Sequence, residues 1–427
     1  MIDKSMSKTK KTLPRGGFFS CLNQRIKRAS KKSCKFMTLK CTINELQSAM
    51  NTNTASYWES YLTQQADYLI VGAGIVGLTC AIELKKHQPK ARVLILERGP
   101  WPSGASIKNA GFACFGSVSE IVADADHHTE QELIALIRKR ARGLEQLKAI
   151  VGSSTMNFQQ VGGYEYFLDT QAELYEGCLA RLKWADDLAK EALETTETIF
   201  STVNNEFGFT QVMDKGILNH HEGHIHTGRL MEALVKEASS KGVLFYGGVE
   251  VASHEEHKNQ VFLNTHKHGV FKTRKLLLAT NGYTAKLLDN LVEPARAQVL
   301  ITRPIPGLKL KGTFHLDQGY YYFREIDQRI LLGGGRNLDF DSERTTEERT
   351  TKSIQEALER LLREVILPHT SVEVDQSWAG IMGIGDKKSP MIKALSPNIY
   401  CGVRLGGMGV ALGTGVGSSL AELAMKA

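Results

Sequence analysis

Residues 67–99 read DYLIVGAGIVGLTCAIELKKHQPKARVLILERG, and this stretch decides the fold. An apolar run at 68–71 is followed by a glycine-rich turn, a helical pattern at 76–87 and a second apolar run at 93–96. Apolar residues three to four positions apart indicate a helix, whereas short apolar runs without polar alternation indicate strands that are buried on both faces. The stretch therefore predicts a βαβ unit with two parallel strands.

The turn of this unit carries the spacing G-x-G-x-x-G at Gly72, Gly74 and Gly77. Such glycines allow a tight turn, a close backbone approach to a pyrophosphate and close packing of helix on strand. The helix N-terminus adds free N–H groups and a partial positive charge, which favour phosphate. Glu97 ends the second run, where a carboxylate can accept hydrogen bonds from a ribose. The unit predicts a dinucleotide site, and its spacing leaves NAD and FAD both open.

The composition is that of an ordinary globular protein, with 427 residues, 42% hydrophobic and 23% charged. It excludes disordered, collagen-like and disulfide-scaffold classes. The net charge of +7 is concentrated at the start, where residues 1–50 hold twelve Lys and Arg against two Asp and Glu. We expect 1–50 to be a disordered basic leader. Dispensable upstream sequence, a targeting segment such as a mitochondrial presequence, and a tail for nucleic acid or acidic lipid remain alternative interpretations.

Several further patterns outline the rest of the chain. Long helical patterns occur at 129–150, 171–200 and 346–367, and strand-like runs occur at 163–168, 243–253, 261–265, 275–280 and 329–333. A nucleotide-type beginning, a strand-rich middle and a glycine-rich end predict an α/β fold whose domains are discontinuous. We expect a Rossmann-like FAD-binding domain from 51–155, 215–285 and 375–427, with an inserted α+β substrate domain from 156–214 and 286–374.

Three more motifs carry a resemblance to a known family. Residues 103–113 (SGASIKNAGFA), 279–282 (ATNG) and 402–411 (GVRLGGMGVA) follow the glycine turn in chain order. Together they resemble the FAD-dependent D-amino-acid oxidase/sarcosine oxidase-like flavoenzymes, over essentially everything after the leader. The resemblance implies a glutathione-reductase-type fold and FAD. We expect the FAD to be non-covalent, because no cysteine falls where flavin-tethering relatives keep one.

The resemblance also implies which residues hold FAD. The pyrophosphate would lie over the glycine turn, and the adenine beside Arg98 and Val251. The isoalloxazine ring would lie between the 103–113 loop and the last glycine run, residues 406–410. Backbone donors at that run would stabilise negative charge on the ring. The expected set is Gly72, Gly74, Ile75, Val76, Gly77, Glu97, Arg98, Ala105, Ser106, Asn109, Ala110, Gly111, Val251, Ala279, Gly406, Gly407, Met408, Gly409 and Val410.

Candidates for substrate chemistry are fewer. Arg324 follows the aromatic run 320–323, so this strand with Tyr322 predicts a pocket for an acidic or zwitterionic substrate, or alternatively a solvent-facing arginine. Lys108 falls in the loop expected near the flavin. Met382 stands where the amino-acid oxidases of the family carry the arginine for the substrate carboxylate, which argues against an ordinary α-amino acid as substrate. A secondary amine, a polyamine derivative, or another carboxylate anchor (Arg324, Arg336 or Arg404) remains open.

Other signals argue against further chemistries. The His-rich stretch 220–226 fits no metal-binding spacing, so no metal is expected. The seven cysteines include no C-x-x-C pair, which favours a reducing compartment, and no apolar run is long enough for a membrane span. We therefore expect a cytoplasmic protein, or a mitochondrial one if the leader is a presequence.

The resemblance and the motifs together predict an enzyme. We expect it to oxidise the C–N bond of a small amine or amino-acid-like substrate by hydride transfer to flavin, with oxygen or another compound accepting the electrons. The alternatives are an NAD-dependent dehydrogenase and, from a different class, a nucleic-acid or membrane-surface binder that acts through the basic leader. The near-neutral body of the chain argues against nucleic acid as a partner.

Overall fold

A computed structural model describes residues 56–58, 61, 65–288, 291–385 and 388–426. The expected leader at 1–50 lies outside the described residues, as do three of the seven cysteines. Within the described part of the chain, no helix is long and apolar enough to cross a membrane.

The predicted βαβ unit is confirmed and lies at the centre of the first sheet. It consists of β1 (Ala66–Val71), α4 (Ile75–His87) and β2 (Val93–Leu96), and β1 pairs in parallel with both β2 and β11. The spatial order is β17 (Met391–Ala394), β18 (Ile399–Val403), β11 (Val270–Leu278), β1, β2, β8 (Leu244–Tyr246), with β10 (Gln260–Thr265) pairing with β11 and β9 (Val251–His257) with β10.

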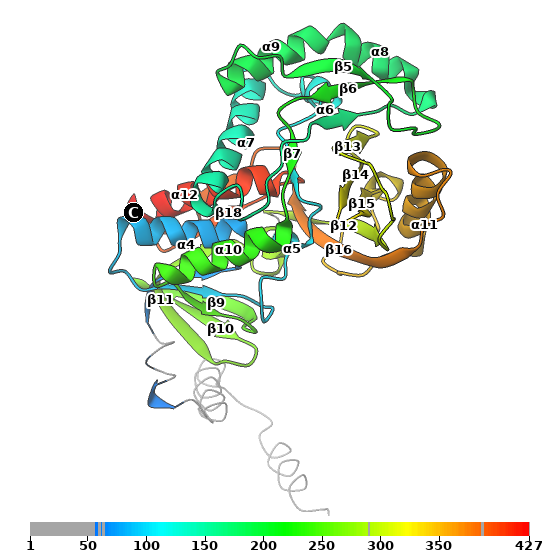
Figure 1. Cartoon of the computed structure of the whole chain (residues 1–427). Helices are drawn as coiled ribbons and strands as arrows, with labels where there is room; N and C mark the ends of the chain where they lie inside the picture. Colours follow the sequence, from blue (N-terminus) through cyan, green and yellow to red (C-terminus); the bar gives the residue numbers. More distant parts are fainter. Residues whose placement is uncertain (1–55, 59–60, 62–64, 289–290, 386–387, 427) are drawn as a thin grey trace, which may run out of the picture. The chain divides into compact units, whose positions relative to one another are not determined.

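Each face of this sheet has its own apolar core, because successive side chains of a strand point to opposite faces. Tyr68 and Ile70 of β1 pack with α4, α7 (Glu130–Val151), α10 (Thr227–Ser240) and α12 (Gly409–Lys426). Leu69 and Val71 pack on the other side with residues of β9–β11 and their surroundings. Figure 1 shows the helices and the β9–β10 hairpin on opposite sides of the sheet.

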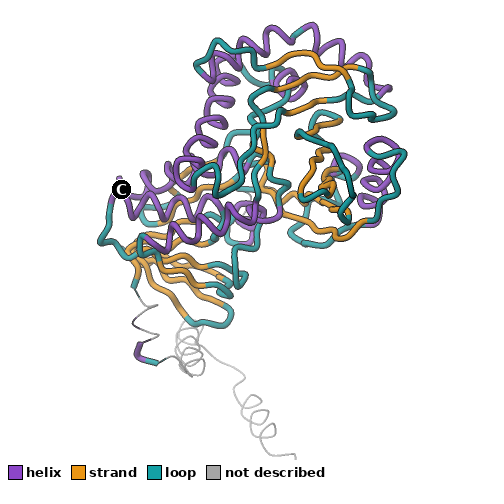
Figure 2. The backbone as a smooth tube through the Cα atoms, in the orientation of Figure 1, coloured by secondary structure: helices purple, strands orange, loops and turns teal. Residues whose placement is uncertain are grey.

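A second sheet of eight strands is almost wholly antiparallel, and its one parallel pair is β13 (Thr313–Leu316) with β4 (Gly163–Glu165). Helix α11 (Lys352–Leu361) and the π-helix η4 (Leu362–Ile366) cover one face of it (Figure 2). Three other helices, α6 (Val118–Asp124), α8 (Ala172–Ala180) and α9 (Leu182–Leu193), pack near β5 (Phe200–Asn204) and β6 (Lys215–Asn219). The order is β16 (Val374–Ile384), β12 (Glu293–Thr302), β15 (Arg329–Gly334), β14 (Tyr321–Ile326), β13 (Thr313–Leu316), β4 (Gly163–Glu165), β6 (Lys215–Asn219), β5 (Phe200–Asn204).

Short elements complete the described chain. They are α5 (Ala105–Lys108), β3 (Phe112–Ala113) paired with β7 (Gly223–His224), and the 3-10 helices η1 (Asp169–Gln171), η2 (Asn281–Lys286) and η3 (Arg336–Leu338). The expected domain boundaries at 215 and 375 would assign β6 and nearly all of β16 to the FAD-binding domain. In the structure both strands pair within the second sheet. The division into domains remains a prediction.

Several predicted elements were wrong in extent. The helical pattern at 171–200 is two helices, and α9 ends because Glu194 adopts the left-handed conformation with φ 57°. The predicted strand at 243–253 is broken at Gly247 and Gly248, where a Cβ on Gly247 would lie 2.3 Å from the carbonyl oxygen of Pro100. The helix expected from 346 begins only at Lys352.

Candidate active site

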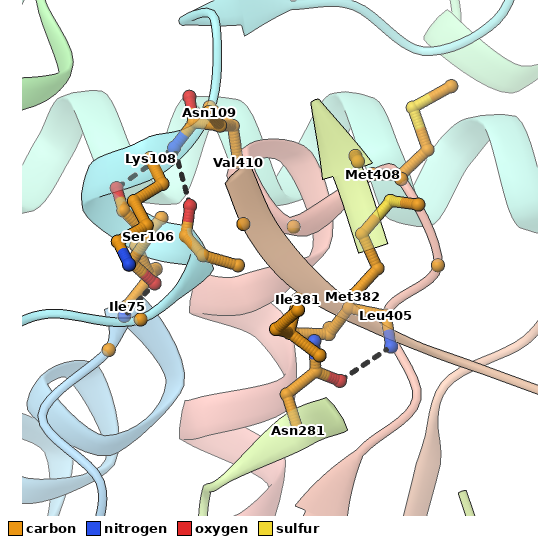
Figure 3. Close-up of a pocket in the computed structure, with 18 of the residues that line it drawn as sticks. Ile75, Ser106, Lys108, Asn109, Asn281, Ile381, Met382, Leu405, Met408 and Val410 are labelled. Carbon is orange, nitrogen blue, oxygen red and sulfur yellow. Dashed lines mark hydrogen bonds between the residues drawn. The ribbon is translucent and has the colours of Figure 1, made fainter. Parts of the chain in front are cut away.

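One cavity of about 680 Å³ connects the motifs of the first sheet with the second sheet. Its wall combines the β1–α4 turn, the 103–112 loop, the start of α12 and strands β12, β14 and β16. Figure 3 shows residues of the β1–α4 turn, the 103–112 loop, β16 and the segment 405–410 around the same space. Every residue predicted to hold FAD lines it except Gly77. Of the candidates for substrate chemistry, Lys108 and Tyr322 line it and Arg324 does not.

The β1–α4 turn needs glycine for steric reasons. Gly72 has φ +102°, and a Cβ there would lie 2.8 Å from the carbonyl oxygen of Ala279. A Cβ on Gly77 would lie only 1.9 Å from the carbonyl oxygen of Gly72. Gly77 therefore sits behind the turn, where α4 packs on the strand, while Gly72 and Gly74 border the cavity. This arrangement matches the tasks of the three glycines in a dinucleotide-binding turn.

Glu97 holds the turn in place from the end of β2. The residue is 7% exposed, and its carboxylate accepts hydrogen bonds from the backbone N–H of Ala73 at 2.9 Å and of Gly99 at 3.0 Å. The Ser103 hydroxyl donates a third at 3.0 Å. Buried carboxylates persist only when their oxygens are bonded, so these donors stabilise the charge at the cavity wall.

The 103–111 loop is fixed to α4 by its own side chains. The Ser106 hydroxyl accepts from the N–H of Ile75 at 3.0 Å, which satisfies one free donor at the start of α4 (Figure 3). The Asn109 amide donates to the carbonyl oxygens of Ala105 and Ser106 and accepts from the N–H of Gly111 at 2.8 Å. The loop is thus pre-shaped beside the glycine turn.

The last glycine run borders open space. Asn281 accepts through its side-chain oxygen from the N–H of Arg404 at 3.0 Å and of Leu405 at 3.3 Å, which anchors the chain just before the run (Figure 3). Gly406 has φ +58°, and a Cβ on Gly406 or Gly409 would meet no atom within 4 Å. Both residues line the cavity, so the missing side chains leave room for a flat group beside the N-terminus of α12. The residues present fit a bound flavin.

Arg98 and Lys108 meet at a carboxylate that sequence reasoning missed. Glu348, in the segment before α11, pairs with Arg98 at 2.8 Å and with Lys108, and also accepts from the Tyr283 hydroxyl. The Arg98 guanidinium lies 4.2 Å above the Tyr283 ring. No local pattern marks Glu348, since it is 240 residues from Lys108.

The structure places Arg324 away from the cavity wall. It is 2% exposed, and its guanidinium donates to the carbonyl oxygens of Ala110 at 2.6 Å, Ile225 at 3.0 Å and Glu325 at 3.2 Å. Burial lowers its pKa to about 10. Neither the expected substrate pocket nor the solvent-facing alternative describes this arginine, because backbone carbonyls occupy its donors.

Tyr322, from the same strand, does line the cavity. Its ring meets the Phe112 ring edge-on, with the two ring centroids 5.6 Å apart. Burial raises the pKa of its hydroxyl to about 12. Tyr322 therefore presents a neutral phenol at neutral pH. Met382 also lines the cavity, close to Gly407, so the position expected for an arginine is apolar (Figure 3).

A polar part of the wall was not predicted at all. It includes Glu120 of α6, Arg140 of α7 and His315 of β13. The His315 ring bonds to Glu222 at 2.6 Å. Burial alone would lower the pKa of His315, but Glu222, with Glu120 and Glu165, outweighs it and raises the pKa to about 9. His315 is consequently an imidazolium at neutral pH. Glu222 was visible only as part of the His-rich stretch.

That stretch separates into different environments rather than one site. His220 bonds to Ser201 at 2.8 Å, His224 is buried in β7, and His226 caps α10 by accepting from the N–H of Arg229. Burial lowers the pKa of His224 to about 4. Across the residues that the structure describes, no three His, Cys, Asp or Glu side chains are grouped as a metal site would require.

Comparisons with known proteins agree with this geometry. Residues 67–423 match the family described as FAD dependent oxidoreductase. The probable oxidoreductase OrdL of Rhizobium meliloti is 25% identical over 387 residues, covering 85% of this chain and 84% of that protein.

Two solved structures share the fold. Glycine oxidase from Geobacillus kaustophilus gives a TM-score of 0.67 at 19% identity, over 85% of this chain and 95% of that one. L-proline dehydrogenase from P. horikoshii gives a TM-score of 0.66 at 18% identity, over 85% of this chain and 94% of that one. These likenesses confirm the predicted α/β fold class, with a Rossmann-like part and a substrate part. With the family match over most of its length, the chain belongs to the D-amino-acid oxidase-like family of FAD-dependent oxidoreductases.

Proposed function

We propose that the enzyme oxidises the C–N bond of a small amine or amino-acid-like substrate, with FAD bound non-covalently in the cavity. The observation that carries this proposal is the shared wall. One cavity is bordered both by a dinucleotide-type turn and by the aromatic and charged side chains of a second sheet. A substrate held against the second sheet would lie beside a flavin held against the first.

In this proposal the first sheet binds the cofactor. The pyrophosphate lies over Gly72, Gly74 and the start of α4, where free N–H groups and the helix dipole favour phosphate. Glu97 accepts from the ribose, and Val251 lies beside the adenine. The 105–111 loop and the 406–410 run hold the isoalloxazine ring. These assignments follow the family pattern and the lining of the cavity.

Cysteine burial supports a non-covalent cofactor. Of the four described cysteines, all buried, Cys114 lines the cavity. Burial, together with Glu222 and Glu120, raises the pKa of its thiol well above the ordinary value. The thiolate is the nucleophilic form, so Cys114 is a poor candidate for attachment to flavin.

The chain contributes mainly position and environment to the reaction. Bound FAD supplies the acceptor for the two electrons that leave the carbon next to nitrogen. Tyr322 and Phe112 give an aromatic wall against which the substrate packs, and Met382 and Met408 restrict water on the other side. Holding the reacting atoms in this geometry provides much of the catalytic effect, and a dedicated acid or base is not required.

The names of relatives support amine chemistry and leave the acceptor open. Glycine oxidase and L-proline dehydrogenase are named for amino-acid oxidation, one as an oxidase and one as a dehydrogenase. We propose oxygen or another compound as the acceptor. The family match does not favour the NAD-dependent alternative. The nucleic-acid or membrane-surface alternative rests on the leader, outside the described residues.

Anaerobic flavin bleaching tests the proposal. The holoenzyme is mixed with a panel of glycine, proline, N-methylated amino acids and primary amines, and the loss of visible absorbance is followed. We expect at least one amine to bleach the flavin and to yield a carbonyl compound with ammonia or an amine. Matched 2-hydroxy acids serve as the control for C–O oxidation. Bleaching by hydroxy acids and by no amine would contradict the proposed bond specificity.

A further inference from the structure

Six cationic side chains besides His315 line the described part of the cavity wall, and they differ in their ion pairs. Arg98 and Lys108 pair with Glu348, and Lys388 pairs with Asp124 at 2.5 Å. Among the described residues, Arg140, Arg336 and Arg404 make no ion pair, and Arg140 is the most buried of the three. In the described part of the chain, the one hydrogen bond of the Arg140 guanidinium runs from Nη1 to the carbonyl oxygen of Phe115 at 3.0 Å.

Arg140 is also deeply buried. The residue is 4% exposed on α7, and among the described residues its Nε has no hydrogen-bond partner. A buried cation without a counter-ion costs folding free energy, so an uncompensated arginine at a cavity wall indicates a site for an anion that is not part of the protein. Gly116 gives the guanidinium room, since a Cβ there would lie 3.2 Å from Nη1.

The neighbouring carboxylates have other partners. Glu222 bonds to His315 and to the Thr313 hydroxyl at 2.9 Å. Glu120 accepts from the N–H of Ser117 at 3.0 Å, as part of the capping box of α6. Glu165 accepts from Ser117 and Ser119. Each of these carboxylates accepts from donors other than Arg140, which leaves the guanidinium of Arg140 available.

The free donors of Arg140 have a defined shape. Because Nη1 donates to the carbonyl oxygen of Phe115, the edge of the guanidinium that remains is the one formed by Nε and Nη2. Two parallel N–H groups on one edge match the two oxygens of a carboxylate. The position where Met382 stands cannot serve this purpose, since methionine carries no donor. Arg336 also lines the cavity with an unpartnered Nε, but it is less buried and stacks on the exposed Phe340 at 4.8 Å.

We propose that Arg140 binds a carboxylate of the substrate through its Nε–Nη2 edge, on the wall formed by α6, α7 and β13. The inference rests on the proposed function and narrows its substrate class to amines that carry a carboxylate. It places the residue that binds the substrate carboxylate on α7, which packs on the first sheet, rather than at the position of Met382 on β16.

Ligand titration of the full-length holoenzyme tests the site. Propionate and its neutral analogue propionamide are added while the flavin spectrum and the melting temperature are recorded. We expect propionate to perturb the spectrum and raise the Tm, and propionamide to do neither at the same concentration. Arg140→Met should weaken propionate binding by about 10- to 100-fold, because a charge-assisted pair is lost.

Arg142→Met is the matched control. Arg142 lies two residues further along α7, is 66% exposed in its side chain and pairs with Glu194 at the surface. We expect it to bind propionate as the unaltered enzyme does. Arg140→Lys, which keeps the charge but loses the two-donor edge, should bind several-fold more weakly than the unaltered enzyme. If Arg140→Met does not fold, the propionate affinity of Arg140→Lys tests the site instead.

The outcomes separate this inference from the proposed function. Unchanged propionate affinity in Arg140→Met or Arg140→Lys overturns the site, as does equal binding of propionamide. A protein that carries no flavin overturns the proposed function, and the Tm shift still tests Arg140 by itself. Loss of the propionate effect in Arg140→Met, with flavin content and Arg142→Met unchanged, supports the site.

Discussion

The two sides of the cavity differ in the sequence distance between the residues that build them. On the cofactor side, the bond from Ala73 to Glu97 joins residues 24 apart. On the substrate side, Glu222 and His315 are 93 residues apart, and Arg324 and Ala110 are 214 apart. The pyrophosphate end of the cofactor side, residues 72–97, is therefore one continuous unit of chain, whereas the substrate side exists only after distant strands and helices have packed.

This difference explains why the two sides depend on different forces. The cofactor side depends on backbone shape, because glycines allow close approaches that no other residue permits. The substrate side depends on buried charges that are satisfied across the fold, where each lost partner leaves an uncompensated group. Variants on the two sides should accordingly fail in different ways.

The largest effect is expected at the glycine turn. Gly77→Ala places a Cβ 1.9 Å from the carbonyl oxygen of Gly72, so α4 must move away from β1. We expect loss of flavin from the purified protein and a drop of about 3 kcal/mol in the free energy of unfolding by urea. Gly177→Ala is the control, since a Cβ at this exposed position of α8 meets nothing within 4 Å and should stabilise by about 0.5–1 kcal/mol. A Gly77→Ala protein with normal flavin content would contradict the steric account.

A smaller effect on flavin, but a comparable one on stability, is expected at Arg324. Arg324→Met leaves the carbonyl oxygens of Ala110 and Ile225 buried without a donor, at a cost of about 3 kcal/mol in total. Urea unfolding measures this cost, and Arg324→Lys should recover only part of it. If Arg324 were instead a substrate ligand, the KM for the amine would rise while stability stayed the same.

The last expected effect is a pH dependence of the free energy of unfolding that arises on the substrate side. The pKa of His315 is about 9 in the folded protein and about 6.5 when unfolded. A base whose pKa is raised by folding stabilises fully below pH 6.5 and loses that contribution as the pH rises through 9. The difference in unfolding free energy between the unaltered enzyme and His315→Gln should therefore shrink from pH 6.5 to 9.

Another histidine titrates in a separate range and provides the comparison. His224 has a pKa lowered to about 4 by burial, so its effect is a loss of stability as the pH falls from 6.5 toward 4. Replacement of His315 should leave that acid limb unchanged. A difference that stays constant from pH 6.5 to 9 would show that Glu222 does not hold the charge of His315.

The sequence predicted the cofactor side of the cavity much better than the substrate side. The βαβ unit, Glu97 and the glycine runs could be predicted because local spacing and periodicity dictate them. Arg140 and Glu348 could not, since an arginine inside an amphipathic helix and a glutamate in a loop look like ordinary surface residues until the fold buries them. Arg324 was noticed for its aromatic neighbours, but its role was set by two carbonyls that lie far away in the chain.

The visible absorption spectrum of the purified full-length protein, before and after denaturation, tests the central claim most directly. We predict flavin bands in the native protein, and their complete release into solution when the chain is denatured and precipitated. A colourless protein that cannot be reconstituted with FAD would contradict the account of the cavity. Bands that stay with the precipitated chain would contradict the non-covalent cofactor.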